Sequence, residues 1–241
     1  MSIHLLGGGW SPDDDGALYR PFIEEATARG RRVGRRVPRV AAVLVREDAD
    51  DLEAFADGFL GMVGRAAPVE LLPTRLLEGG VLESAVLSDI DGLLIAGGLT
   101  PAYLDAVTPI IDEIRLLVSD GLPYLGFSAG AAIAADRAVI GGWRLGEIPV
   151  CPQEASEDLE DVTVAVGLGL VDLAVDVHAA QWGTLARLIA ATEAGLVDGG
   201  VAIDEHTALI VGEGALRVEG RGSVWRVSDT DDGVLVGTLG L

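Results

Sequence analysis

The sequence predicts an α/β fold in which helices flank an open, mostly parallel sheet. Over the first two-thirds of the 241 residues, short apolar runs alternate with longer amphipathic runs. Such alternation indicates βαβ units, and their right-handed crossovers give parallel strands. One apolar run ends in Gly126-Phe127-Ser128-Ala129-Gly130, which predicts a strand, a tight turn and a helix. No repeat or linker interrupts the chain, so we expect residues 1–241 to form one domain.

The expected elements of this first part follow the apolar pattern. The strands are Ile3–Leu6, Val40–Val45, Val69–Leu72, Asp91–Ala96 and Leu122–Phe127, and the helices are Leu18–Ala28, a segment around Asp51–Val63 and a segment after Pro101. The fixed φ of Pro101 suits the first turn of a helix.

After about residue 136 the pattern changes. Glycines, prolines and acids are mixed over 141–161, which predicts a long surface excursion. The later elements are a strand at Val171–Val177, a helix at Gln181–Glu193 and short strands at Gly200–Ile203, Ala208–Val211, Leu216–Glu219 and Ser223–Val227. Gly220-Arg221-Gly222 separates the last two strands and predicts that they form a hairpin.

Ser128 lies in a G-x-S-x-G segment that is typical of a nucleophile on a sharp strand-to-helix turn. Such a serine has strained dihedral angles, and the strand and helix pass close together, so Gly126 and Gly130 remove Cβ atoms that would clash. The helix N-terminus offers unpaired N–H groups where an oxyanion would form. The alternative is a tight β–α turn with an incidental serine, but the flanking context favours catalysis.

Composition excludes several classes of function. The net charge of −21 argues against nucleic acid and anionic membranes as partners. All 17 basic residues are arginines, so a Walker A lysine, a pyridoxal-phosphate Schiff base and a Ser-Lys dyad are excluded. Asparagine is absent too, which excludes a Cys-His-Asn triad. Six arginines over Arg29–Arg39 form either an anion or partner patch or, as we favour, a solvated loop before the next strand.

The sequence favours a cytoplasmic location and no membrane association. No stretch of about 18 uncharged apolar residues occurs. The first residues lack a basic region followed by an apolar one. The single cysteine, Cys151, rules out a disulfide within the chain and fits a reducing compartment.

A serine nucleophile needs a base, and the chain has three histidines. His4 lies within the first strand and is expected to be a buried or edge residue. His178 follows Val171–Val177, at the carboxyl edge where open α/β sheets place their sites. His206 follows a later short strand and is the second candidate. We predict that His178 takes the Ser128 proton and later delivers it to the leaving group.

The base needs an acceptor that orients its ring, and Asp172, Asp176, Asp204 and Glu205 are candidates. A second oxyanion donor is expected from Gly97-Gly98, where a strand ends in a glycine pair. The first strand ends similarly, in Gly7-Gly8-Gly9. Neither segment completes the G-x-G-x-x-G pattern, so no dinucleotide is predicted, and we expect neither a cofactor nor a metal.

These segments together resemble the serine peptidase family of dipeptidase E and cyanophycinase. The matching segments, in order, are Gly97-Gly98 with Thr100, the stretch Gly126–Ala131, Asp176-Val177-His178 and the stretch Ala202–Ala208. The likeness covers most of the chain, from the glycine-rich end of the first strand to Gly220–Val227. It implies a class I glutamine-amidotransferase-like fold, a flavodoxin-like three-layer arrangement here followed by short C-terminal strands.

The resemblance also implies residue roles. Ser128 would be the nucleophile, His178 the base, and the amides of Gly98 and Ala129 the oxyanion hole. Glu205 matches the acid of the cyanophycinase branch, whereas the dipeptidase branch places an Asp soon after the turn, where Asp136 is nearest. The third member therefore stays open among Glu205, Asp204 and Asp136.

Some positions depart from the family pattern. Leu99 stands where relatives often carry Asn or Gln, and His178-Ala179-Ala180-Gln181-Trp182 replaces a His-Phe sequence followed by arginines. Specificity for aspartyl dipeptides or cyanophycin is therefore not carried over. We predict a metal-independent serine hydrolase that cleaves a peptide or amide bond of a small substrate.

Two rival functions stay open. One is an α/β-hydrolase esterase with His206 as base, although the chain order Ser-His-Glu differs from the Ser-acid-His order of that fold. The other is a catalytically silent member that binds a small molecule or a partner. The oligomeric state is also open, with a homodimer as one option.

Overall fold

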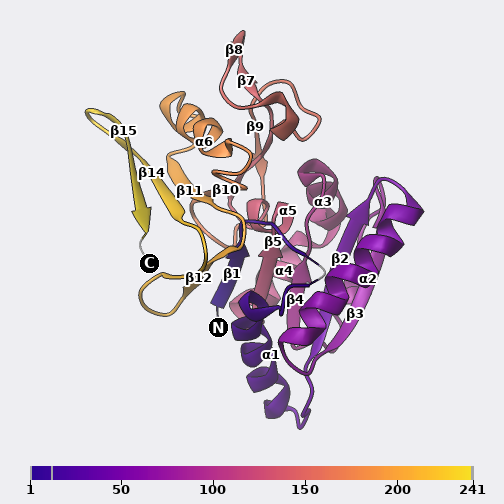
Figure 1. Cartoon of the computed structure of the whole chain (residues 1–241). Helices are drawn as coiled ribbons and strands as arrows, with labels where there is room; N and C mark the ends of the chain where they lie inside the picture. Colours follow the sequence, from indigo (N-terminus) through magenta and orange to yellow (C-terminus); the bar gives the residue numbers. More distant parts are fainter. Residues whose placement is uncertain (1, 12, 240–241) are drawn as a thin grey trace.

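The computed structural model describes residues 2–11 and 13–239, and two sheets organise them (Figure 1). The larger sheet of these residues has seven strands, in the spatial order β13 (Arg217–Gly220), β12 (Thr207–Gly212), β1 (Ser2–Leu6), β5 (Tyr124–Phe127), β4 (Gly92–Ile95), β2 (Arg39–Arg46) and β3 (Glu70–Leu77). The smaller sheet has, within the same residues, β10 (Ala174–Val177), β11 (Gly199–Ile203), β14 (Val224–Thr230) and β15 (Gly233–Leu239). Two short ribbons pair β6 (Arg137–Gly141) with β9 (Thr163–Val166) and β7 (Arg144–Leu145) with β8 (Ile148–Pro149).

Strand direction in the larger sheet confirms the predicted fold class. β1, β5, β4, β2 and β3 run parallel to their neighbours, and β12 and β13 add an antiparallel edge. The central strands β4 and β5 and the segment Val40–Val45 of β2 are wholly buried, whereas β3, at the edge of the sheet, alternates between partly buried and exposed residues. Strands that are covered on both faces need a continuous apolar character.

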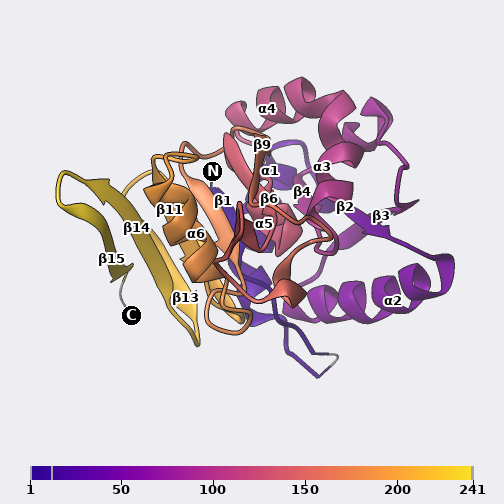
Figure 2. The ribbon, with the colours of Figure 1, turned by 90° about the horizontal axis from the view of Figure 1, so that it is seen from above.

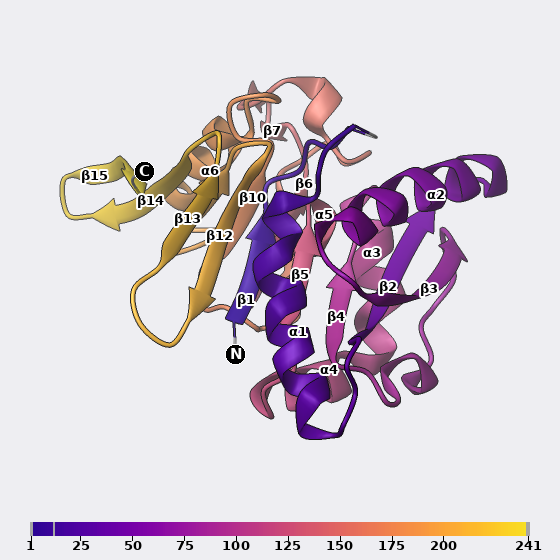
Figure 3. The same cartoon turned by 60° about the horizontal axis from the view of Figure 1, so that its bottom comes forward.

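Helices cover both faces of the larger sheet. The α-helices of the described residues are α1 (Arg20–Arg32), α2 (Ala49–Ala66), α3 (Thr100–Val107), α4 (Ile111–Ser119), α5 (Ala129–Ala132) and α6 (Thr184–Glu193). Figure 3 shows α1 in front of β1 and β5, with α4 behind the sheet. Short 3-10 turns occur at Ala17–Tyr19, Ser84–Leu87, Thr108–Ile110 and Gln153–Ala155. No helix of the described residues combines the length and the apolar character needed to cross a bilayer.

The two sheets share one hydrophobic core. Its main cluster of buried side chains contains Val43 and Leu94 of the larger sheet together with Val177 and Ile203 of the smaller one. A satellite cluster, with Leu188 at its centre, lies between α6 and the smaller sheet. Figure 2 shows β14 and β15 on the opposite flank of the molecule from α2. The shared core is consistent with one domain.

The predicted hairpin at Gly220-Arg221-Gly222 is wrong. β13 pairs with β12 in the larger sheet, whereas β14 pairs with β11 and β15 in the smaller one. The glycine segment therefore carries the chain from one sheet to the other. A turn-forming composition specifies a change of direction, but it does not specify which strand becomes the partner.

Two other segments differ from expectation. The last turn of α1, rather than a loop, contains Arg29, Arg31 and Arg32. Positive charge is favourable there because it interacts with the negative end of the helix dipole. Arg35 and Arg39 are paired with Asp89, and Arg35 also binds Asp91. Ion pairs thus occupy part of the arginine-rich segment. The excursion over 141–161 contains the β7–β8 ribbon and the 3-10 turn Gln153–Ala155, and it leads into β9.

Candidate active site

Ser128 lies where β5 ends and α5 begins, in a strained backbone conformation. Its φ is 51° and its ψ is −111°, a region that non-glycine residues rarely adopt. The turn is fixed because the Ser128 amide donates to the Leu6 carbonyl at 2.9 Å. The helix that follows is a single turn, shorter than the run of small residues predicts. The serine side chain is 8% exposed.

Three glycines make this turn sterically feasible. A Cβ atom on Gly126 would lie 2.3 Å from the Gly130 carbonyl oxygen, and one on Gly130 would lie 2.2 Å from that of Ile95. A Cβ atom on Gly97 would lie 2.6 Å from Cβ of Ser128. Real Cβ atoms do not approach backbone this closely, so β4, β5 and α5 can meet only at glycine.

Ser128, His178 and Glu205 form a hydrogen-bonded chain. The Oγ atom of Ser128 lies 2.8 Å from Nε2 of His178, and Nδ1 of His178 lies 2.7 Å from Oε1 of Glu205. His178 follows β10, and Glu205 lies in the turn between β11 and β12. The serine therefore comes from the larger sheet, and the imidazole comes from the end of a strand of the smaller one.

The glycine-rich end of β1 joins these parts. The amides of His178 and His206 donate to the carbonyls of Gly7 and Gly8, at 2.9 and 2.8 Å. A Cβ atom on Gly8 would lie 2.1 Å from the His178 ring, and one on Gly9 would lie 2.7 Å from Cβ of Glu205. The segment Gly7–Gly9 therefore packs directly against the imidazole and the carboxylate and limits their positions.

The environment of His178 favours its neutral form. Burial lowers the pKa of His178, and the hydrogen bond and negative charge of Glu205 oppose that effect without cancelling it. The indole of Trp182 stacks on the imidazole, with ring centroids 3.8 Å apart and planes 7° from parallel. Trp182 is itself 43% exposed, so it covers the imidazole on the solvent side.

A cleft of about 480 Å³ opens over Ser128 and His178. Its walls include Gly97, Gly98 and Leu99 on one side and Trp10, Phe55 and Trp182 on others. Acidic side chains of the 141–161 excursion complete it, namely Glu154, Glu157 and Asp158. The carboxylate of Glu157 accepts a hydrogen bond from the Thr100 amide at 2.8 Å, and burial raises its pKa.

The basic side chain of the cleft is already engaged. Arg46 forms an ion pair with Asp51 at 3.1 Å and donates to the Gly97 and Val45 carbonyls. Its guanidinium also lies 3.5 Å from the centroid of the Phe55 ring. Arg46 thus supports the glycine pair of the cleft wall, and the free charge of the cleft is negative.

The predicted oxyanion donors lie beside Ser128. Gly98 lines the cleft, and Ala129 is the next residue along the chain. Among the residues that the structure describes, the amides of Gly98 and Ala129 have no hydrogen-bond partner. Both amides are therefore free to bind a ligand oxygen.

The other candidate acids have different partners. Asp204 accepts from the amides of Ala180 and Ser223 and from the Trp225 indole, at 2.8 to 3.0 Å. Asp176 forms a buried ion pair with Arg187 at 2.7 Å. Asp172 is exposed on the surface, and Asp136 does not line the cleft. Glu205 is therefore the candidate acid that contacts His178.

The other histidines lie elsewhere. His4 is fully buried in β1, with its ring 5.8 Å from that of Phe22. His206 does not line the cleft, and its Nδ1 atom lies 3.9 Å from a carboxylate oxygen of Asp14. Neither is placed beside Ser128.

Sequence reasoning missed several residues of the cleft, chiefly Arg46, Phe55 and Glu157. An arginine at the end of a strand, a helical phenylalanine and a loop glutamate are ordinary features of a sequence. Leu99 and Trp182 could be singled out from the sequence, because they differ from the family pattern beside segments that match it.

The fold and this site define an α/β protein with a hydrogen-bonded serine, histidine and glutamate at the ends of its strands. The solved structure of a peptidase from an acI-B1 Actinobacterium matches 100% of this chain and 95% of its own, with a TM-score of 0.66 and 18% identity. A putative peptidase E protein from Listeria monocytogenes EGD-e matches 92% of this chain and 98% of its own, with a TM-score of 0.54 and 14% identity. At these identities the likeness shows the fold.

Sequence relatives point to one family. A cyanophycinase from Trichormus variabilis is 36% identical over 175 residues, which cover 69% of this chain and 55% of that protein. A cyanophycinase from Synechococcus elongatus is 38% identical over 152 residues, 61% of this chain and 44% of that protein. The chain thus spans about half the length of the curated relatives it matches. No protein-family model matches it. Together these relatives and solved structures support the family of dipeptidase E and cyanophycinase-like peptidases.

Proposed function

We propose that this protein is a serine peptidase that cleaves a small peptide-like substrate, with Ser128 as nucleophile, His178 as base and Glu205 as the orienting acid. The observation that carries the proposal is the unbroken hydrogen-bonded chain from Ser128 Oγ through His178 to Glu205. A neutral imidazole can accept the serine proton, and the carboxylate holds the ring and stabilises the imidazolium that forms.

In the acylation step, Ser128 Oγ attacks the carbonyl carbon of the scissile amide while its proton passes to Nε2 of His178. The amides of Gly98 and Ala129 donate to the oxyanion of the tetrahedral intermediate. When the intermediate collapses, the C–N bond breaks and the leaving amine takes the proton from His178. The acyl group remains on Ser128 as an ester.

In the deacylation step, His178 removes a proton from water, which attacks the ester carbonyl. The second tetrahedral intermediate breaks its bond to Oγ, and His178 returns the proton to Ser128. The acid product leaves and the resting enzyme is restored. None of these steps requires a group beyond the side chains and amides named.

The cleft supports a small substrate that carries positive charge. Its volume of about 480 Å³ lies in the range of small-molecule sites. Glu154, Glu157 and Asp158 line it, while Arg46 is engaged by Asp51. We propose that a free amino terminus or a basic side chain of the substrate lies against this acidic wall.

The proposal is tested by fluorophosphonate labelling and by hydrolysis of a dipeptide library. Wild type should be labelled at Ser128 and should hydrolyse a subset of the library, and Ser128→Ala should lose both activities. His178→Ala should lower kcat/KM by about 10⁴-fold or more, whereas His206→Ala, the matched control, should retain activity.

Two results would contradict this assignment. If only His206→Ala were inactive, the esterase reading with His206 as base would hold instead. If folded wild type were neither labelled nor active across the library, the protein would be a catalytically silent binder.

The remaining expectations belong to the same proposal. One domain over residues 1–241, a cytoplasmic location and a homodimer as one option for assembly stay predictions. Size-exclusion chromatography with light scattering measures the assembly directly.

A further inference from the structure

A second cavity lies behind the catalytic cleft, on the other side of the segment Gly8–Trp10. It has a volume of about 330 Å³, at the lower end of the roughly 300–1,000 Å³ range of small-molecule sites. Gly9 and Trp10 line both spaces, but Ser128, His178 and Glu205 do not line this one. The cavity is therefore a separate space that shares a wall with the cleft.

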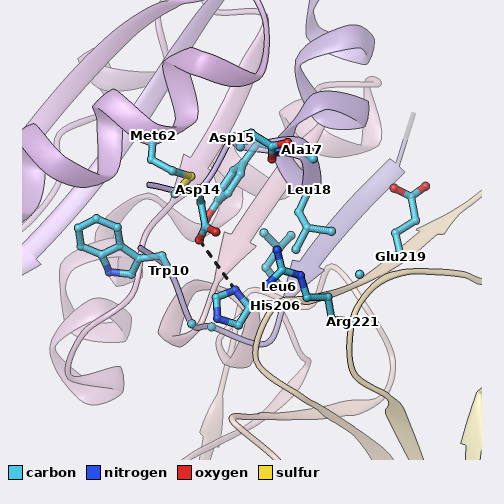
Figure 4. A pocket seen from close by; sticks show the side chains of 15 residues that line it. Leu6, Trp10, Asp14, Asp15, Ala17, Leu18, Met62, His206, Glu219 and Arg221 are labelled. Carbon is cyan, nitrogen blue, oxygen red and sulfur yellow. Dashed lines mark hydrogen bonds and ion pairs between the residues drawn. The ribbon is translucent and has the colours of Figure 1, made fainter. Parts of the chain in front are cut away.

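The apolar part of the cavity comes from several elements. Leu6 at the end of β1, Leu18 before α1, Met62 of α2 and Trp10 line it. Figure 4 shows these side chains around the space, together with the polar groups of Asp14, His206 and Arg221. An apolar wall of this kind fits an aliphatic or thioether side chain, because it offers no polar partner there.

The cavity also has a positive group without a partner. Arg221, in the segment that connects the two sheets, is exposed, and among the described residues its guanidinium has no ion pair or hydrogen bond. Its amide donates to the His206 carbonyl at 3.0 Å, which fixes the backbone beside the cavity. A planar guanidinium in this position is suited to bind a carboxylate through two hydrogen bonds.

The opposite charge comes from Asp14, and Asp15 and Glu219 also line the cavity. One carboxylate oxygen of Asp14 accepts from the Ser11 amide at 2.9 Å and lies 3.9 Å from Nδ1 of His206, too far for a hydrogen bond. Close to it lies Tyr19, which is 3% exposed and lines the cavity. Burial, and secondarily the charge of Asp14, raise the pKa of the Tyr19 phenol.

The Tyr19 hydroxyl is the observation that points to a ligand. Among the residues that the structure describes, this hydroxyl has no hydrogen-bond partner. The hydroxyl is not among the buried polar atoms that lack a partner, so it is open to the cavity and can bond to a ligand there. A polar group bound between Tyr19 and Asp14 would satisfy both.

We propose that this cavity binds a free amino acid with an apolar side chain. Its ammonium group lies at Asp14 and Tyr19, its carboxylate lies at Arg221, and its side chain lies among Leu6, Leu18 and Met62. A zwitterion fits because one molecule supplies an anion for Arg221 and a cation for Asp14, whereas a ligand with one charge serves only one of these two groups. The proposal is independent of the proposed peptidase function.

Binding of L-leucine to Ser128→Ala protein, measured by titration calorimetry and thermal unfolding, tests the proposal. The Ser128→Ala variant lacks the proposed nucleophile, so a leucine-binding result in this variant does not depend on whether the protein is a peptidase. We expect saturable binding of one leucine per chain and a rise in Tm of roughly 3–6 °C at about ten times Kd. Leucinamide and 4-methylpentanoate, which lack the carboxylate and the ammonium group, should each bind at least about tenfold more weakly.

Paired variants assign the site. Arg221→Gln and Asp14→Asn should each weaken leucine binding at least about tenfold, whereas Arg31→Gln on α1 and Glu157→Gln in the cleft should change it less than about twofold. Absence of leucine binding, or binding unchanged by Arg221→Gln, would overturn the proposal. Loss of binding in Glu157→Gln would place the ligand in the cleft and would overturn it too.

Discussion

At the scale of single residues, the candidate site depends on three unusual backbone conformations. Ser128, His178 and His206 all have φ between 51° and 56°, in the left-handed region that disfavours L side chains. Each is held by an amide hydrogen bond to β1 or to the segment after it, through Leu6, Gly7 and Gly8. Tertiary contacts thus stabilise conformations that the local sequence alone would not select.

The pH dependence of kcat/KM should report the state of His178. Because the base must be neutral and burial lowers its pKa, kcat/KM should rise with pH through a midpoint below 6.5 and then level off. Glu205→Gln removes the group that raises this pKa, so the midpoint should move to still lower pH. The plateau should fall by about 10²–10⁴-fold. A midpoint that moves to higher pH in Glu205→Gln would contradict the assignment.

Trp182 is expected to act as a positioning residue through its stack on His178. Trp182→Ala should lower kcat by about tenfold with a smaller effect on KM, because the imidazole gains freedom. It should also move the pH midpoint towards 6.5, because water replaces the indole. Trp182→Phe retains a ring and should stay close to wild type in both measurements. Equal behaviour of the two variants would exclude the stack as the cause.

At the scale of elements, close packing of β4, β5 and α5 decides where Ser128 lies. Gly130→Ala places a Cβ atom 2.2 Å from the Ile95 carbonyl oxygen, so the strand and the helical turn must separate. We expect a loss of about 3 kcal/mol or more in the free energy of unfolding, measured with urea. Gly61→Ala, in α2 with open space around it, should stabilise the protein by about 0.5–1 kcal/mol. Gly130→Ala with unchanged stability would contradict the packing argument.

The buried ion pair of Arg187 and Asp176 ties α6 and β10 to the acidic wall of the cleft. The guanidinium of Arg187 also donates to the carbonyls of Ala155 and Gly142, at 2.6 and 3.3 Å. Arg187→Leu leaves the buried Asp176 carboxylate without its cationic partner, with the Val177 amide still donating to it, and we expect a loss of about 3–5 kcal/mol in urea unfolding.

Arg137→Gln is the matched control for this variant. Arg137 is exposed and donates to the Leu196 carbonyl. Its replacement should change the free energy of unfolding by less than about 0.5 kcal/mol. If the two variants lost the same stability, the loss would reflect removal of positive charge rather than of the buried pair.

At the scale of the whole molecule, the net charge of −21 is unfavourable for the folded state. Repulsion among surface carboxylates is strongest at low salt and is screened as the Debye length falls from about 30 Å at 0.01 M to about 3 Å at 1 M. We expect the free energy of unfolding to rise with NaCl, by an amount on the order of 1 kcal/mol. Measurements with sucrose in place of salt provide the control, and a decrease with NaCl would contradict this expectation.

Much of the fold and the centre of the site could be predicted from the sequence. Two kinds of local signal made this possible. An apolar run such as Val40–Val45 indicates a buried strand. The glycines around Ser128 indicate a backbone that packs too closely for a Cβ atom. The choice of His178 over His206 also came from a local feature, its place at the end of a strand.

The sequence by itself determined the parallel α/β core and the serine turn, because periodicity and glycine requirements act over a few residues. Only the tertiary structure decided that β13 and β14 enter different sheets, that Glu157 and Ser128 line the same cleft, and that Trp182 stacks on His178. It also decided that Arg221 and Asp14 share a second cavity. Apart from the stack of Trp182 on His178, these contacts join segments tens to hundreds of residues apart, and their free energy depends on the packing of the whole molecule rather than on any local pattern.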